Sequence, residues 1–295
     1  MLDFNTSLLL KIISSLFFLV SGIAWKKILI NGKKNYHYIF YRVIATLFLF
    51  LLIKFYFQYN EIENLNKVIS VITFKDWIVC ISICLFSFWG LYFYTEALQN
   101  GRLSFIAPLN GISYLFTIVT SVLIFNESLS APKYIALSLI LIGLFLQQKD
   151  KLVDFKVSKE LFLTLLFSMI WGISFVLYLI PIKKFGILDF SIILELCVFV
   201  SCVGLLMFNE KKVIPPKLNK NNLLLCLFMG FLVAGGSLLS NFTLTQLPVS
   251  LNILIGLLFE LIVLAVGLKF FREKLNSKDW LLIVLATIGG FLLLF

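Results

Sequence analysis

Long apolar segments separated by short polar connectors make up almost the whole chain. Ten of them approach the roughly 20 apolar residues that a helix needs to cross a bilayer. They lie at about 7–25, 37–57, 77–98, 103–125, 132–147, 160–181, 188–208, 222–243, 248–268 and 279–295. The pattern predicts an all-α membrane protein with ten transmembrane helices and no large domain outside the membrane.

The composition agrees with a bilayer as the solvent. The chain has 295 residues, of which 61% are hydrophobic and 14% are charged, and its mean hydropathy is +1.03. A soluble domain carries roughly 45–50% apolar and about 25% charged residues. The net charge of +10 comes from lysines and arginines in the connectors, so we expect it to report membrane orientation rather than nucleic-acid binding.

Specialised chemistry finds little support in the sequence. The five cysteines lie in apolar segments and fit packing better than disulfides or metal ligands. His37 is the only histidine, and no G-x-x-x-x-G-K-[ST] motif occurs that would bind ATP phosphates. No catalytic constellation is present either. We therefore predict a protein that is not an enzyme and has no cofactor, no metal and no nucleic-acid partner.

An internal repeat is marked by "IFNESL" (124–129) and "FFREKL" (270–275). Glu127 and Glu273 follow apolar segments and lie 146 positions apart, and the same shift superimposes other pairs without a gap over more than about fifty residues. These pairs include Gly90 with Gly236, Ser104 with Ser250, Phe125 with Phe271 and Gly143 with Gly289. We infer two copies of a five-helix unit, at 1–150 and 151–295.

The number of helices in each copy predicts how the copies are related. After five crossings the second copy starts on the opposite side of the membrane. The copies are therefore expected to be inverted, with a pseudo-two-fold axis in the membrane plane. This arrangement is typical of secondary transporters, whose substrate sites lie near the membrane midplane between the repeats.

The repeat also resembles a known family. The segment "YTEALQNGRLSFIAPLNGISYLFTIVTSVLIFNESLSAPKYIALSLILIGLFL" resembles the EamA domain of the drug/metabolite transporter superfamily. That domain has an alanine-leucine ending its third helix, a glutamate-x-leucine closing its fourth and a glycine late in its fifth. "FELIVLAVGLKFFREKLNSKDWLLIVLATIGGFLL" and "WGISFV" resemble it again in the second half, and Arg42 matches an arginine often found early in its second helix.

The resemblance covers essentially the whole chain. It implies export or exchange of small metabolites by alternating access, without ATP. The family often has a proline halfway along its fourth and ninth helices. This sequence has Ser113-Tyr114 and Phe259-Glu260 there, and Pro108 comes earlier, so the resemblance carries no mid-helix kink at those places.

Glu260 is the leading candidate for a functional acid. A charge at the centre of a membrane helix costs roughly 2.5–3.5 kcal/mol, so intramembrane acids are functional candidates by default. Asn252, Gly256 and Glu260 recur at four-residue spacing and form one helical stripe. We predict that Glu260 carries a proton or binds a cation. The alternative is a protonated glutamate that is hydrogen-bonded to a neighbouring helix.

Glu96 ends the third segment on a face with Phe86, Trp89 and Phe93. Such an aromatic face suits a cationic or amphipathic solute through stacking and cation–π contacts. It equally suits lipid or core packing, with Glu96 reaching the interface. Glu195, in the seventh segment, is a third acid to consider.

Other polar and aromatic residues fall in the predicted spans. The candidates for lining a substrate cavity are Asn110, Tyr114, Trp171 and Asn241. Packing or helix–helix hydrogen bonding is the alternative for each of them. For Arg42 we expect contact with headgroups or a structural pairing.

Glu127 and Glu273 have a different predicted role. Both lie at tight turns ahead of Ser130 and Ser277, which we predict as N-caps of the next helices. Carboxylates there accept hydrogen bonds from free backbone N–H groups and favour the positive end of the following helix. We interpret them as structural residues of the two hairpins.

The distribution of positive residues predicts orientation. Connectors after odd-numbered segments hold 17 lysines and arginines and those after even-numbered segments hold 6, which with Lys11 and Arg42 inside segments accounts for all 25. By the positive-inside rule the odd connectors are cytoplasmic and both termini lie outside an inner (plasma) membrane.

These observations favour a secondary transporter. The expected cargo is a small organic metabolite, such as an amino acid or a related compound, moved by export and driven by protons or by a solute gradient. We expect a monomer or a homodimer in the lipid bilayer. The rival hypotheses are a membrane-embedded enzyme acting on lipid intermediates and a non-transporting scaffold.

Overall fold

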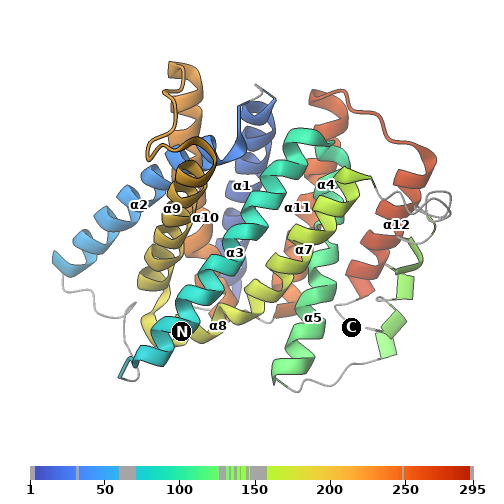
Figure 1. Ribbon diagram of the computed structural model, residues 1–295. Coiled ribbons are helices and arrows are strands. Elements are labelled where there is room, and N and C mark those ends of the chain that lie inside the picture. The colour runs from blue at the N-terminus through green and yellow to red at the C-terminus, as the bar shows by residue number, and fades with distance from the viewer. Residues whose placement is uncertain are drawn as a thin grey trace. The chain divides into compact units, whose positions relative to one another are not determined.

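A computed structural model describes residues 4–30, 33–59, 71–125, 158–247 and 249–292, together with 131–132, 134–135, 138–139, 141–143 and 146. Every element assigned within these residues is a helix (Figure 1). The predicted all-α class is therefore confirmed for this part of the chain. All five cysteines are buried and free, as the sequence predicts.

The helices follow the predicted apolar segments closely. They are α1 (Phe4–Leu29), α2 (Asn35–Tyr59), α3 (Phe74–Asn100), α4 (Leu103–Leu109), α5 (Ile112–Phe125), α7 (Lys159–Leu177), α8 (Leu179–Phe185), α9 (Ile187–Glu210), α10 (Lys220–Gln246), α11 (Val249–Phe270) and α12 (Ser277–Leu292). Seven stretches of the described residues are long and apolar enough to cross a membrane: α1, α2, α3, α4 with α5, α7 with α8, α9 and α10. The ninth and tenth predicted segments coincide with α11 and α12, and much of the fifth lies outside the described residues.

The fourth predicted span is interrupted where α4 meets α5. Pro108 has no backbone N–H and cannot donate to the preceding turn. Beyond it the chain makes shorter i→i+3 bonds, from Gly111 N–H to Pro108 O (3.2 Å), from Ser113 N–H to Asn110 O (2.8 Å) and from Tyr114 N–H to Gly111 O (3.2 Å). This turn of 3₁₀ geometry places Asn110 at the junction of the two helices. The interruption that follows Pro108 therefore lies earlier in the span than the mid-helix proline of the family pattern.

The sixth predicted span is also divided, at Tyr178 between α7 and α8. Pro181 lies in the first turn of α8, where a missing N–H is tolerated. Gly186 ends α8 with a φ of 82°, a conformation that favours glycine. Apolar periodicity alone gives a single helix here, because the interruption changes the backbone and leaves the hydropathy unchanged.

The chain divides into two compact units that do not coincide with the two sequence copies. The first unit comprises Met1–Tyr92 and Leu177–Gln246, and the second comprises Phe93–Val176 and Leu247–Phe295. In the first unit α10 packs on α1 and α2, and α9 packs on α2 and α8. In the second unit α4 packs on α11 and α12, and α12 also packs on α5 and α11. Each unit thus combines helices from both copies.

Small residues allow close helix packing in the first unit. A Cβ placed on Gly230 of α10 would lie 2.9 Å from the carbonyl oxygen of Arg42 on α2. The Thr46 hydroxyl donates to the Gly230 carbonyl at 3.2 Å, and the Ser14 hydroxyl of α1 donates to the Gly236 carbonyl at 2.8 Å. Membrane helices approach closely through small residues and short polar contacts of this kind.

Candidate functional site

Glu260 and Asn110 meet in the second unit. The Asn110 side chain, at the junction of α4 and α5, donates from Nδ2 to Oε1 of Glu260 on α11 at 2.8 Å. Both residues are half-buried. None of the ion pairs found in the described part of the chain includes Glu260. This acid on an apolar helix is therefore held by a neutral donor.

Tyr114 and Gly256 meet beside this pair. A Cβ placed on Gly256 would overlap the Tyr114 hydroxyl, so the absence of a side chain on α11 lets the phenol of α5 approach its backbone. One turn earlier on α11, the buried Asn252 side chain donates to the carbonyl oxygen of Leu247 at 3.4 Å. Two members of the predicted stripe, Gly256 and Glu260, thus face the junction of α4 and α5.

The internal repeat relates the Asn110–Glu260 contact to the Tyr114–Gly256 contact. The shift of 146 positions carries Asn110 onto Gly256 and Tyr114 onto Glu260. The contact between Asn110 and Glu260 is therefore equivalent to the contact between Gly256 and Tyr114 when the two copies change places. The crossing of the fourth and ninth predicted spans consequently joins equivalent parts of the two copies.

Aromatic rings from two helices gather in the same unit. The Tyr94 ring of α3 lies 5.1 Å from that of Trp171 and 5.2 Å from that of Phe167, both on α7, by ring centroids. Phe167 and Trp171 are 5.5 Å apart. Gly172, next to Trp171, packs against α5, because a Cβ there would overlap the Ser113 carbonyl oxygen. Trp171 was predicted as a candidate, whereas Tyr94 and Phe167 were not, although the four-residue spacing of Phe167 and Trp171 is visible in the sequence.

Glu96 has other partners in the structure. Its Oε1 accepts from Nζ of Lys159, at the start of α7, at 3.0 Å and from Nδ2 of Asn100 at 3.1 Å. Phe93, on the same helix, is half-buried. The structure places Glu96 in an ion pair near the end of α3.

Two further candidates belong to the first unit. Trp89 is 42% exposed, and its ring packs 5.7 Å from that of Tyr92. Asn241 is buried on α10 and donates to the Ser191 hydroxyl of α9 at 3.0 Å. For Asn241 the observed contact is the predicted alternative, a hydrogen bond between helices.

The first unit holds a buried ion pair between α2 and α9. Nη1 of Arg42 lies 2.6 Å from Oε1 of Glu195, and the two side chains are 2% and 6% exposed. Arg42 Nε and Glu195 Oε2 are buried and have no partner in the residues that the structure describes. The predicted structural pairing of Arg42 is therefore observed, with the third intramembrane acid as its partner.

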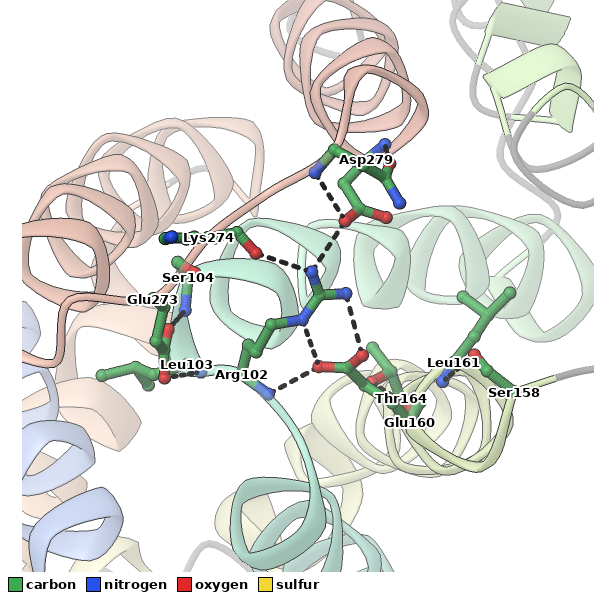
Figure 2. Close-up of polar contacts among 11 residues, drawn as sticks. Arg102, Leu103, Ser104, Ser158, Glu160, Leu161, Thr164, Glu273, Lys274 and Asp279 are labelled. Carbon is green, nitrogen blue, oxygen red and sulfur yellow. Dashed lines mark hydrogen bonds and ion pairs between the residues drawn. The ribbon is translucent and has the colours of Figure 1, made fainter.

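A second charged network surrounds Arg102, which precedes α4 (Figure 2). Its Nη2 lies 3.0 Å from Oε2 of Glu160, and its Nη1 lies 2.8 Å from Oδ2 of Asp279 and 2.9 Å from the Lys274 carbonyl. Burial disfavours the charged guanidinium, but the bonds to Glu160 and Asp279 outweigh it and raise the pKa of Arg102. The network ties α7 and α12 to the start of α4.

Glu273 caps α4. Its carboxylate accepts from the backbone N–H groups of Leu103 at 2.9 Å and Ser104 at 2.7 Å (Figure 2). Glu273 accepts backbone N–H bonds, as predicted, but it does so at the start of α4 and not at the start of the helix that follows it. Gly267 leaves room for this contact, because a Cβ there would lie 2.6 Å from Ser104 N.

The helix that follows Glu273 has a different cap. The side chain of Asn276 accepts from Asp279 N–H at 2.7 Å, and α12 begins at Ser277. The predicted N-cap at Ser277 is wrong by one residue, because the amide of Asn276 reaches the free N–H first. Glu127 and Ser130 lie outside the described residues.

A comparison with protein families identifies the chain's relatives. The model of the EamA-like transporter family matches residues 5–147 and 158–295. The chain belongs to the EamA-like transporter family. A search among curated proteins returned no match. The two matched regions agree with the two copies inferred from the repeat of 146 positions, and with several apolar helices they make this EamA protein a multi-pass membrane protein.

Connectors that follow odd-numbered predicted spans of this EamA protein meet one another within each unit. In the first unit, Lys33 Nζ lies 3.2 Å from the Lys217 carbonyl, and His37 Nε2 lies 2.7 Å from Oε1 of Glu210. The first contact joins the connectors after the first and seventh predicted spans, and the second joins the start of α2 to the end of α9. In the second unit, Arg102 joins the connector after the third span to the one after the ninth.

Proposed function

We propose that this EamA protein is a secondary transporter that exports a small organic metabolite by alternating access, without ATP. Family membership supports transport as the general activity. The observation that carries the finer proposal is the Glu260 carboxylate, which lies in an apolar helix with the neutral amide of Asn110 as its hydrogen-bond donor. An acid in this setting is a functional candidate by default, because membrane burial of a carboxylate is costly.

The local geometry fits a group that changes partners. A carboxylate paired with arginine loses a strong charge-assisted interaction when it turns to a solute. Glu260 gives up a single bond to an amide, and it can accept a proton or a donor from the cargo instead. Glu260 is therefore our candidate for binding the cargo or carrying a proton, with Asn110 positioning it. Tyr114, Trp171 and Asn252 are proposed to complete the site.

An inverted arrangement of the two copies supports the proposed cycle. Five spans in each copy would place the copies in opposite orientations, and the reciprocal contacts of Asn110 and Tyr114 fit a pseudo-two-fold axis near the crossing of α4, α5 and α11. In inverted-repeat transporters the substrate site lies close to such an axis. Movement of one group of helices relative to the other would then expose the cargo to each side in turn.

We further propose that the odd-numbered connectors are cytoplasmic in an inner (plasma) membrane, from the excess of positive residues in them. Single cysteines at Lys212 and Lys183, in a background without the native cysteines, test this orientation. A membrane-impermeant thiol reagent added to intact cells should label position 183 and spare position 212. Labelling of position 212 alone would reverse the orientation.

Flux through proteoliposomes tests the transport proposal. A panel of radiolabelled amino acids and related metabolites should include a compound that exchanges faster in liposomes holding the protein than in empty ones. Glu260→Gln should abolish most of that flux. No specific flux for any compound would favour the scaffold or enzyme alternatives, and full pH-driven flux by Glu260→Gln would overturn a proton role for Glu260.

A further inference from the structure

We propose that the cargo is an amine cation with an aromatic or similarly flat apolar body, recognised in the second unit by Glu260, Asn110 and the rings of Tyr94 and Trp171. The inference rests on the proposed transport function and specifies its substrate class. Its support comes from three features of the described residues: the orientation of Asn110, the charges near Glu260 and the grouped rings.

The side chain of Asn110 presents an unused acceptor. Only its NH₂ group can donate to a deprotonated carboxylate, so the bond from Nδ2 to Glu260 turns Oδ1 away. Oδ1 is buried and has no hydrogen-bond partner within the described part of the chain. Leaving such an oxygen unpaired costs about 1–3 kcal/mol. The site therefore offers two acceptor groups, a carboxylate and a carbonyl, and a ligand with several N–H donors would satisfy both.

The charge around Glu260 favours a cation. Three other glutamates have cationic partners: Glu195 with Arg42, Glu96 with Lys159 and Glu160 with Arg102. In the residues described, Glu260 accepts from the neutral amide of Asn110 and takes part in none of the observed ion pairs. A ligand carboxylate placed there would face a like charge, which disfavours acids and zwitterions relative to amines.

The grouped rings supply the remaining part of the recognition. Tyr94, Phe167 and Trp171 lie with their centroids 5.1–5.5 Å apart, and Gly172, next to Trp171, packs against the Ser113 backbone next to Tyr114. The faces of such rings attract cations, and their edges and faces pack against a flat apolar body. An ammonium group on a short arm next to an aromatic ring would match a carboxylate next to this ring cluster.

Four ligands that share one ring test the charge directly. Tyramine is a cation, tyrosol is neutral, 4-hydroxyphenylacetate is an anion and tyrosine is a zwitterion. Binding to the purified full-length protein in detergent is measured by the shift in unfolding temperature over a concentration series. Tyramine should bind at least about tenfold more tightly than each of the other three, corresponding to a charge-assisted bond. Equal or tighter binding of any of them, or no binding of tyramine, would overturn the proposal.

Variants locate the site. Glu260→Gln should weaken tyramine binding by roughly 10- to 100-fold, since hydrogen bonds to charged groups contribute about 1.5–3 kcal/mol. Asp189→Asn is the matched control, because it removes a carboxylate that pairs with Lys54 in the first unit, and it should leave tyramine binding unchanged. Trp171→Leu is a second test that keeps every charge, and it should weaken the binding of tyramine more than the binding of tyrosol. Unchanged tyramine binding in both Glu260→Gln and Trp171→Leu would place the ligand elsewhere and refute the site.

Flux separates this inference from the proposed function. Transport of tyrosine or 4-hydroxyphenylacetate without transport of tyramine would refute the amine class and leave the transporter intact. Failure of every compound in the wider metabolite panel would count against transport itself.

Discussion

Two glutamates on apolar helices of this protein have contrasting partners. Glu195, in the first unit, lies 2.6 Å from the guanidinium of Arg42, and both side chains are almost fully buried. Glu260, in the second unit, accepts from the neutral amide of Asn110 and is only half-buried. Both acids lie on apolar helices of similar hydropathy, so the helices alone do not distinguish them.

The difference shows how a partner determines what a buried acid can do. Removing a carboxylate from water costs several kcal/mol, and an arginine at bonding distance offsets much of that cost only while the pair stays intact. Glu195 is therefore expected to stay paired with Arg42. Glu260 gains less from its amide, so a proton or a cationic ligand competes more easily for it. Four predictions follow, from the largest expected change in stability to the smallest, and Lys54→Met serves as a control for the first.

Arg42→Met should produce the largest loss of stability. It leaves the Glu195 carboxylate buried without its cation, and breaking a buried pair in this way costs about 3–5 kcal/mol. The double variant Arg42→Met/Glu195→Met should recover most of the loss, because it removes both charges. Unfolding in detergent, followed by circular dichroism, measures the difference. A double variant as unstable as the single one would show that the packing of Arg42 matters more than its charge.

Lys54→Met provides the control for that experiment. Lys54 and Asp189 also lie 2.6 Å apart in the first unit, but their side chains are 32% and 30% exposed. An exposed pair contributes about 0–1 kcal/mol. Equal losses of stability in Lys54→Met and Arg42→Met would show that burial does not explain the effect of Arg42→Met.

Gly256→Ala should cause an intermediate loss of about 1–3 kcal/mol, typical of overpacking. The new methyl group would overlap the Tyr114 hydroxyl, so Tyr114→Phe in the same chain should restore part of the stability. A double-variant cycle by thermal unfolding measures the coupling. Additive effects would show that the two residues do not share a contact. One of the two reciprocal contacts at this crossing would then be refuted.

Glu273→Gln should have a smaller effect, about 0.3–1 kcal/mol, because glutamine keeps one acceptor but loses the charge at the start of α4. Hydrogen exchange should quicken at the amides of Leu103 and Ser104 and change little in the first unit. Unchanged exchange at these amides would contradict the cap.

Glu260→Gln should change stability least, by less than about 0.5 kcal/mol, since a neutral side chain on α11 no longer bears the cost of a buried charge and can still bond to Asn110. Its effect on flux should nevertheless be about tenfold or more. Thermal unfolding and proteoliposome flux, measured on the same preparation, check the two parts. A loss of stability as large as that of Arg42→Met would mean that Glu260 is structural, and the contrast between the two acids would fail.

Most of the spans could be predicted because hydropathy alone determines them. The predicted segment 188–208 corresponds to α9 at Ile187–Glu210, and 222–243 corresponds to α10 at Lys220–Gln246. The helices run a few residues further because backbone hydrogen bonding continues into polar ends that an apolar pattern omits. The turn at Asn110 was missed because it depends on a missing N–H at Pro108, to which hydropathy is insensitive.

The site could be predicted only in part. Helical spacing placed Gly256 and Glu260 on one stripe, and they do face the junction of α4 and α5. Tyr94 was missed because its neighbours, Phe167 and Trp171, lie more than about seventy positions away in the sequence. Glu273 was placed at the wrong helix for the same reason: its partners Leu103 and Ser104 are brought near by tertiary packing, whereas sequence spacing pointed to α12.

The reciprocal contacts at the crossing of the two copies also bear on how a duplicated chain can diverge. Two identical five-span chains meeting at this place would have to carry the same residues at both contacts, with either a pair of acids or none. A single polypeptide is free of that requirement, and here one contact has become Asn110 with Glu260 while the other has become Tyr114 with Gly256. At the proposed site a symmetric pair would offer a solute two equivalent orientations, whereas the fused chain would offer it one.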